Sequence, residues 1–186
     1  MLIIVGKSAT GKDTIANELC KMGYTRIVTF TTRPKRPFET DGISYNFITV
    51  EDFLTKYIDG FFLEARHYNT ESGIWFYGSS FSSYENADDK TICILTPSGL
   101  RKLRENFIPF TGFLINISDE EIIKRQELRG DNATEEKKKE AERRFKTDKI
   151  DFQNINNLID FTINNENRSA EEVAKEIDRL YRKGCE

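Results

Sequence analysis

The chain has 186 residues, a formal net charge of −3 and 32% charged residues. This length suits one domain with a sizeable core, and the slightly acidic balance argues against nucleic-acid or membrane binding as the main activity. No apolar run approaches the length of a membrane-spanning helix, and the run at the N-terminus is too short for a signal peptide.

The first predicted element is a buried strand over residues 2–5, and the loop that follows it has the spacing of a phosphate-binding P-loop. Two glycines enclose four residues, and Lys12 follows the second glycine. Such glycines let backbone N–H groups point inward, the helix N-terminus adds positive potential, and the lysine supplies a point charge. We therefore expect a nucleotide phosphate to be bound by Gly6, Ser8, Ala9, Thr10, Gly11, Lys12, Asp13 and Thr14. An ordinary strand-to-helix turn is the alternative.

One residue breaks this pattern, because Asp13 stands where Ser or Thr normally ligates Mg²⁺. A carboxylate beside polyphosphate is repulsive unless a cation lies between them. One hypothesis is that Asp13 binds Mg²⁺ itself. The alternative is that it only caps the helix, which an Asp in a first turn does well.

Beyond this loop, strand and helix patterns alternate, which predicts an α/β fold with a parallel core sheet flanked by helices. A Thr-Pro pair at Thr96 marks one helix start, and residues 118–121 and 169–172 read as capping boxes that open two more helices. The predicted strands cover residues 27–30, 91–95, 113–117 and 161–163, and the predicted helices cover 13–22, 97–105, one from 119 and one from 170.

Two stretches interrupt the alternation. Residues 31–85 are rich in aromatic and turn residues, which indicates a small, mostly antiparallel lobe with one helix near 51–57. Residues 125–149 are strongly charged, and they predict either a solvated helical hairpin or a mobile lid that carries arginines over a phosphate. The core then comprises residues 1–30, 86–124 and 150–186 of a single domain.

The lobe opens with an anion-binding pattern. Arg33 and Arg36 lie in a loop braced by prolines, and Tyr45 follows. Guanidinium groups grip phosphate oxygens with two hydrogen bonds each, and a phenol adds a third donor. Taken alone, the same residues also fit a surface loop with solvated charges.

Downstream of a P-loop, this block resembles the guanylate kinase family. The shared pattern is Thr-Thr-Arg at 31–33, an arginine three residues later, then Glu39, Gly42 and Tyr-x-Phe at 45–47. The resemblance continues through residues 62–65, 77–79, Arg125, 129–130 and 160–164. It implies a P-loop nucleoside monophosphate kinase, a monomer or homodimer, that transfers the terminal phosphate of ATP to GMP or dGMP with Mg²⁺.

The resemblance also implies roles for individual residues. Glu64 suits guanine, because a carboxylate accepts the two parallel donors N1–H and N2–H that other bases cannot present together. The implied acceptor phosphate ligands are Arg33, Arg36, Tyr45 and Tyr77, and the implied base pocket is Thr29, Glu64 and Ser79. Gly78 and Thr96 are further implied acceptor-binding residues. The implied lid cations are Arg125, Arg129 and either Arg143 or Arg144, with Asn164 near the adenine of ATP.

Two departures from the family pattern keep other functions open. Family members usually end the third core strand in Asp-x-Asp, whereas this chain has Ile94-Leu95-Thr96, so Asp13 is expected to offset the missing acids. A Gly-Lys-Asp P-loop also resembles ribose 1,5-bisphosphate phosphokinase, a sugar-phosphate kinase. A non-catalytic binding module of the same fold is a further alternative, although Lys12 and the arginine set argue against it.

Cysteine and histidine usage excludes other chemistry. Cys20, Cys93 and Cys185 are odd in number and far apart, which fits neither a disulfide framework nor a metal site. Reduced thiols in the cytoplasm are the simplest account, so we expect a cytoplasmic protein. His67 is the only histidine, which leaves no histidine-based triad or zinc site.

Overall fold

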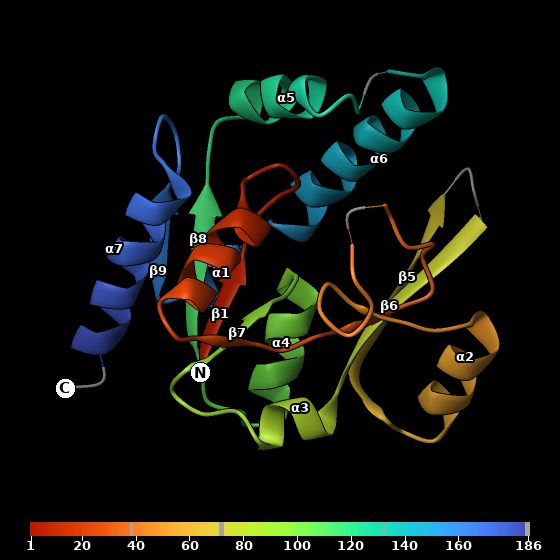
Figure 1. The fold of residues 1–186 in the computed structure, drawn as a ribbon, viewed down its shortest axis with the longest axis horizontal. Helices are drawn as coiled ribbons and strands as arrows, with labels where there is room; N and C mark the ends of the chain where they lie inside the picture. The colour runs from red at the N-terminus through yellow and green to blue at the C-terminus, as the bar shows by residue number, and fades with distance from the viewer. Residues whose placement is uncertain (38, 71–72, 132, 185–186) are drawn as a thin grey trace.

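A computed structural model describes residues 1–37, 39–70, 73–131 and 133–184, so Cys185 lies outside the described residues. Within them the chain forms two sheets (Figure 1). The core sheet has the strand order β2-β7-β1-β8-β9, and all of its neighbouring strands are parallel. Its strands are β1 (Leu2–Val5), β2 (Thr25–Arg26), β7 (Thr91–Ile94), β8 (Thr111–Asn116) and β9 (Phe161–Asn164).

Helices cover both faces of the core sheet. Alternate side chains of β1 point to opposite faces, so both faces are apolar and both are packed against helices. Leu2 and Ile4 pack in the cluster that includes helices α1 (Lys12–Lys21) and α7 (Ala170–Lys183). Ile3 and Val5 pack in a second cluster that includes α4 (Pro97–Glu105). All four side chains of β1 are fully buried. The predicted α/β fold with a parallel core sheet is confirmed.

The second sheet has the order β4-β3-β6-β5 and holds the aromatic residues of the lobe. The strands β5 (Phe62–Thr70) and β6 (Gly73–Ser80) form an antiparallel pair, and β6 also pairs with β3 (Phe30–Thr31). The strand β4 (Asn46–Phe47) pairs with β3. Helix α2 (Val50–Ile58) packs against β5, where the rings of Phe53 and Phe62 stack with centroids 4.4 Å apart, and α3 (Phe81–Glu85) follows β6.

The strand predicted over residues 27–30 is wrong. The core strand β2 ends at Arg26, and Phe30 begins β3 of the other sheet. Ile27 is buried in the core, whereas the ring of Phe30 lies against Phe61 and Phe62 of the lobe. The apolar run therefore divides between the two sheets, because its two ends have different partners.

The predicted lid region is helical. Helix α5 (Asp119–Leu128) follows β8, and α6 (Glu135–Asp151) runs between the loop before α1 and the β5–β6 pair (Figure 1). A short 3-10 helix, η1 (Ile155–Asn157), leads to β9. No helix among the described residues is both long and apolar enough to cross a membrane.

One of the two predicted capping boxes is absent. The Ser118 hydroxyl accepts the Glu121 N–H, but the Glu121 carboxylate pairs with Arg125 and the Ser118 N–H donates to Glu166 instead. The box predicted at Ser169 is present, with both of its hydrogen bonds formed.

Candidate active site

The P-loop has a conformation that its glycines make possible. A Cβ atom on Gly6 would lie 2.6 Å from the Ile115 carbonyl oxygen and 2.7 Å from the Thr10 hydroxyl, so no larger residue fits there. Gly11 adopts a positive φ of 91°, which glycine reaches without strain. The buried Thr10 hydroxyl donates to the Lys7 carbonyl at 2.8 Å, which braces the loop from within.

Lys12 projects over this loop, where its ammonium group donates to the Lys7 carbonyl at 2.7 Å. Desolvation by burial lowers the pKa of Lys12, and the carboxylates of Asp13 and Asp148 oppose that shift. A desolvated ammonium gains the most from a bound anion, because an anion replaces the water that burial has removed.

The arginine loop holds one guanidinium in a fixed place. Arg33 is only 6% exposed, and its Nη2 pairs with Glu39 at 2.7 Å. The other Glu39 oxygen accepts the Arg36 backbone N–H at 2.8 Å, so this single carboxylate organises the whole loop. The Arg33 Cζ atom also lies 5.6 Å from the ring centroid of Tyr45.

The predicted base pocket centres on Glu64. In the β5–β6 register Glu64 lies opposite Ser79, whose hydroxyl donates to Glu64 Oε1 at 3.1 Å. The buried Tyr84 hydroxyl donates in turn to Ser79 Oγ at 2.8 Å, a contact that the sequence did not reveal. Burial raises the pKa of Glu64, while the charge of Arg66 and the Ser79 hydroxyl oppose the shift. A Cβ on Gly78 would lie 2.9 Å from the Phe62 ring, so glycine keeps this pocket compact.

These features meet in one cavity of about 890 Å³ between the core, the lobe and α6. Its size suits a small organic ligand. The predicted site residues that line it are Gly6, Ser8, Ala9, Lys12, Asp13, Thr29, Arg33, Arg36, Tyr45, Glu64, Tyr77, Gly78, Thr96, Arg129 and Arg144, and Arg143 lines it too.

Comparison with known proteins places this geometry in a family. The sequence model of the guanylate kinase family matches residues 1–183. A guanylate kinase of Cutibacterium acnes is 32% identical over 168 residues, which cover 87% of this chain and 81% of that protein. The crystal structure of guanylate kinase from Anaplasma phagocytophilum covers 98% of this chain and 85% of its own, with a TM-score of 0.70 at 25% identity. The chain belongs to the guanylate kinase family.

Two further relatives agree. A guanylate kinase of Hydrogenovibrio crunogenus is 30% identical over an alignment of 194 residues, gaps included, which covers all of this chain and 89% of that protein. One of Bdellovibrio bacteriovorus is 40% identical over 89 residues, which cover 47% of this chain and 46% of that protein. The predicted family is confirmed, and with it the predicted class of enzyme, an ATP-dependent nucleoside monophosphate kinase.

In this guanylate kinase family member, Asp13 does not cap α1 by a hydrogen bond. The N-cap residue is Gly11, and the helix has no side-chain cap. The Asp13 carboxylate, which is 72% exposed, instead pairs with Arg26 Nη2 at 2.8 Å. Asp13 does lie in the positive first turn of the helix, so the cap alternative stays open as a favourable charge without a hydrogen bond.

Helix α6 contacts the P-loop directly, which sequence reasoning missed. The Asp148 carboxylate accepts the Ser8 backbone N–H at 2.6 Å. Beside it, Asp119 of α5 bridges Lys7 of the P-loop at 2.8 Å and Lys149 of α6 at 3.4 Å. A carboxylate from the lid region thus occupies one of the backbone donors expected to bind phosphate.

The remaining predicted residues lie around the cavity rather than on its wall. Arg125 donates to the Asn165 carbonyl and to Glu121, so it packs behind the P-loop. Asn164 is exposed, whereas the neighbouring Asn165 is buried and donates to the Thr10 carbonyl at 2.8 Å. Ser79 supports Glu64 as described, Thr10 and Gly11 shape the loop, and Thr14 is exposed on α1.

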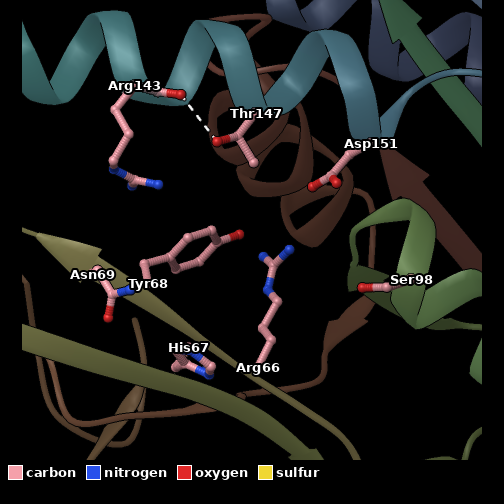
Figure 2. Close-up of a pocket in the computed structure, with 8 residues that line it drawn as sticks. All are labelled: Arg66, His67, Tyr68, Asn69, Ser98, Arg143, Thr147 and Asp151. Atoms are coloured by element: carbon pink, nitrogen blue, oxygen red, sulfur yellow. Dashed lines mark hydrogen bonds between the residues drawn. The ribbon is translucent and has the colours of Figure 1, made fainter.

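A smaller cavity of about 440 Å³ adjoins the first, between β5 and α6 (Figure 2). Two guanidiniums lie near the ring of Tyr68, with the Cζ atoms of Arg66 and Arg143 at 4.9 and 5.1 Å from its centroid. Both Arg143 and Arg144 pair with Glu140, so this contact does not choose between them. The exposed His67 lines the smaller cavity and does not line the larger one.

Proposed function

We propose that the chain transfers the terminal phosphate of ATP to GMP or dGMP, which gives ADP and GDP or dGDP. The observation that carries this proposal is a half-buried carboxylate, Glu64, which is braced by Ser79 and lines the same cavity as the P-loop lysine and the arginine loop. A single cavity can then hold a guanine base, its phosphate and a donor phosphate together.

Guanine recognition rests on Glu64. Its carboxylate accepts N1–H and the N2 amino group, and Ser79 and Tyr84 fix its orientation by the chain of hydroxyl hydrogen bonds. A base without that pair of donors leaves a buried carboxylate unpaired, which discriminates strongly against it. Thr29, Gly78 and Thr96 line the same cavity and complete the pocket in this proposal.

Phosphate chemistry here needs alignment and positive charge rather than a general base. The acceptor phosphate is already ionised at neutral pH, so its oxygen attacks without losing a proton. Arg33, Arg36, Tyr45 and Tyr77 hold that phosphate, and the P-loop amides with Lys12 hold the donor. Arg129 with Arg143 or Arg144 supplies charge from the lid helices. Arg125 positions the P-loop, and the proposed role of Asn164, the last residue of β9, is to contact the adenine of ATP.

Asp13 fits a role toward Mg²⁺. The described residues contain no cluster of three or more His, Cys, Asp or Glu side chains that could hold a metal. Mg²⁺ in kinases is held by one or two carboxylates together with substrate phosphates, so a single exposed carboxylate beside Lys12 suffices. When bound, the ion neutralises phosphate charge. To bind Mg²⁺, the Asp13 carboxylate must give up its ion pair with Arg26. The cationic side chains of the protein hold the phosphates whether or not Asp13 binds the metal.

An ADP-release assay tests the activity. The purified chain receives ATP with GMP, dGMP, AMP, CMP, UMP or ribose 1,5-bisphosphate in separate reactions. We expect turnover with GMP and dGMP and at least about 100-fold lower kcat/KM with the other acceptors, because the unpaired Glu64 penalises them. Preferred turnover of ribose 1,5-bisphosphate would refute the proposal, and the absence of any turnover would favour a binding module.

Assembly and location stay predictions: a monomer or homodimer in the cytoplasm. Cys20 and Cys93 are free thiols among the described residues. Thiols of this kind persist under reducing conditions, which supports the cytoplasm.

A further inference from the structure

Arg66 lies on the ligand-facing side of β5. The register pairs Glu64 with Ser79, Arg66 with Tyr77 and Tyr68 with Trp75. Because every second residue of a strand faces the same way, Arg66 shares a face with Glu64 and lies directly opposite Tyr77. Both of those neighbours have proposed roles toward the acceptor, whereas the sequence pattern gave none to Arg66.

The Arg66 side chain points away from the strand toward α6, and its guanidinium lies between the ring of Tyr68 and Asp151 (Figure 2). It lines both cavities, together with Thr147 and Asp151 of α6. Asp148, which contacts the P-loop, lies on the same stretch of that helix. The guanidinium is therefore located where the acceptor pocket meets the P-loop side of the cavity.

The Arg66 guanidinium makes no ion pair within the part of the chain that the structure describes. Among the residues that the structure describes, no carboxylate oxygen lies within 4.0 Å of an Arg66 nitrogen, and the Arg66 Cζ atom lies 4.9 Å from the centroid of the Tyr68 ring. Five other arginines of the cavity are paired with carboxylates: Arg26, Arg33, Arg129, Arg143 and Arg144. A half-buried cation that makes no close ion pair gains more from a bound anion than a fully solvated cation does.

The charge of Arg66 acts on both halves of the site. Burial is the main cause that lowers the pKa of Lys12, and the charge of Arg66 adds to it; the same charge opposes the burial that raises the pKa of Glu64. The acceptor phosphate already has Arg33, Arg36 and two tyrosines in the proposed function. The phosphoryl group that is transferred from ATP is the remaining anionic group that Arg66 could bind.

We propose that Arg66 is a further catalytic residue, whose guanidinium binds oxygens of the phosphoryl group during its transfer. This inference rests on the proposed ATP-to-GMP activity. In the step, an acceptor phosphate oxygen forms a bond to the terminal phosphorus of ATP. The bond from that phosphorus to the bridging oxygen breaks, and its electron pair leaves with ADP. Arg66 keeps its proton throughout and neutralises charge on the oxygens in flight.

The strand-end residues of this chain give the extra cation a purpose. Ile94 and Thr96 line the cavity without a carboxylate, at the positions where the family pattern has two acids that help to hold Mg²⁺. With fewer acids to anchor a metal, positive charge fixed on the protein gains importance. Arg66 supplies it from a strand rather than from the lid helices.

The test compares Arg66→Gln with His67→Gln, the neighbouring residue that is exposed and faces the other side of β5. Initial rates give kcat and KM, calorimetry gives the Kd of GMP and of a non-hydrolysable ATP analogue, and thermal unfolding reports the fold. We expect Arg66→Gln to lower kcat by about 100-fold or more, with both Kd values within about threefold of wild type. His67→Gln keeps kcat within about twofold. Arg66→Lys recovers part of the rate, because it keeps the charge but loses the planar fork.

Two results would overturn the inference. One is a kcat within about threefold of wild type for Arg66→Gln. The other is a loss confined to weaker GMP binding, which would make Arg66 a base contact. If Arg66→Gln fails to fold, a wild-type kcat for Arg66→Lys decides against the inference, and a lowered kcat at wild-type Kd supports it. The wild-type control separates the two proposals: if it forms no ADP from ATP and GMP, the proposed function fails, whatever Arg66 does.

Discussion

Asp148 is expected to weaken the binding of ATP, because it occupies a donor that phosphate needs. The Ser8 N–H cannot bind the Asp148 carboxylate at 2.6 Å and a phosphate oxygen at the same time. A hydrogen bond to a charged group contributes about 1.5–3 kcal/mol, and about 1.4 kcal/mol is a tenfold change in affinity. Asp148→Ala should therefore tighten ATP binding by about 10-fold to 100-fold. The partial exposure of Asp148 favours the lower end of that range.

Calorimetric titration with a non-hydrolysable ATP analogue measures this effect, with Mg²⁺ held constant. Glu142→Ala is the matched control, since it removes the same charge from the exposed side of α6. Asp148→Asn should fall between wild type and Asp148→Ala, because a neutral amide oxygen still accepts the Ser8 N–H more weakly. Titration with pyrophosphate should show the same order of variants, since the competition concerns phosphate alone.

Equal or weaker ATP binding by Asp148→Ala would refute this reasoning. It would mean that the contact stabilises the closed position of α6 and that the helix helps to hold the donor. A matching gain in Glu142→Ala would instead point to long-range charge rather than to the hydrogen bond, and raising the ionic strength would then abolish the gain.

Three further predictions address other parts of the site. Glu64→Gln should lower kcat/KM for GMP by at least about tenfold, since a mispaired buried group costs about 1–3 kcal/mol, and an unchanged value would remove Glu64 from the pocket. Because burial raises the pKa of Glu64, the ionised carboxylate lowers the stability of the folded protein at pH values above the ordinary pKa of glutamate, so Glu64→Gln should have a higher Tm than wild type at pH 7. For the wild-type protein, the KM for GMP should rise as the pH falls through the raised pKa of Glu64. Asp13→Asn should raise the Mg²⁺ concentration that gives half-maximal activity while the fold stays intact. Asp13→Ser should have only part of the wild-type activity when Mg²⁺ is limiting. Full activity of both variants at low Mg²⁺ would contradict a metal role for Asp13. Gly6→Ala should lower both Tm and ATP affinity, because its Cβ would lie 2.6 Å from a backbone oxygen, and a wild-type melting curve would refute that.

Elements whose signals are local were predictable from the sequence. The strand at 2–5, its P-loop and the helix opened by Thr96-Pro97 each depend on residues within one turn or strand, and the structure has all three. The structure of residues 27–30 was not predictable from local signals. This segment divides between two sheets because Phe30 packs against the distant Phe61 and Phe62. The box at Ser118 failed for a similar reason: Glu166 competes for its backbone N–H across 48 residues.

Residues outside the motifs to which we assign proposed roles could not be predicted in the same way. Tyr84, Asp148 and Arg66 stand in ordinary strand and helix sequence. Only the packing of α6 and β5 brings Asp148 and Arg66 to the cavity, and only the packing of α3 brings Tyr84 against Ser79. The nearest available signal was composition: a charged segment at 125–149 predicted cations over a phosphate, but not an acid on the P-loop.

The charges around the P-loop connect the missing strand-end acids with two acids that lie near the P-loop in this chain. Two acids are missing where β7 ends, at Ile94 and Thr96, and two acids approach the P-loop from elsewhere, Asp13 on α1 and Asp148 on α6. The strand end is fixed by the core sheet, whereas Asp13 can release Arg26 and Asp148 can release Ser8 when a phosphate competes for those donors. We expect acids that can change partner in this way to repel an entering phosphate less than acids fixed at the strand end would. A fixed pair of strand-end acids added back at Ile94 and Thr96 would therefore overload the site with negative charge unless Asp13 and Asp148 were neutralised with them.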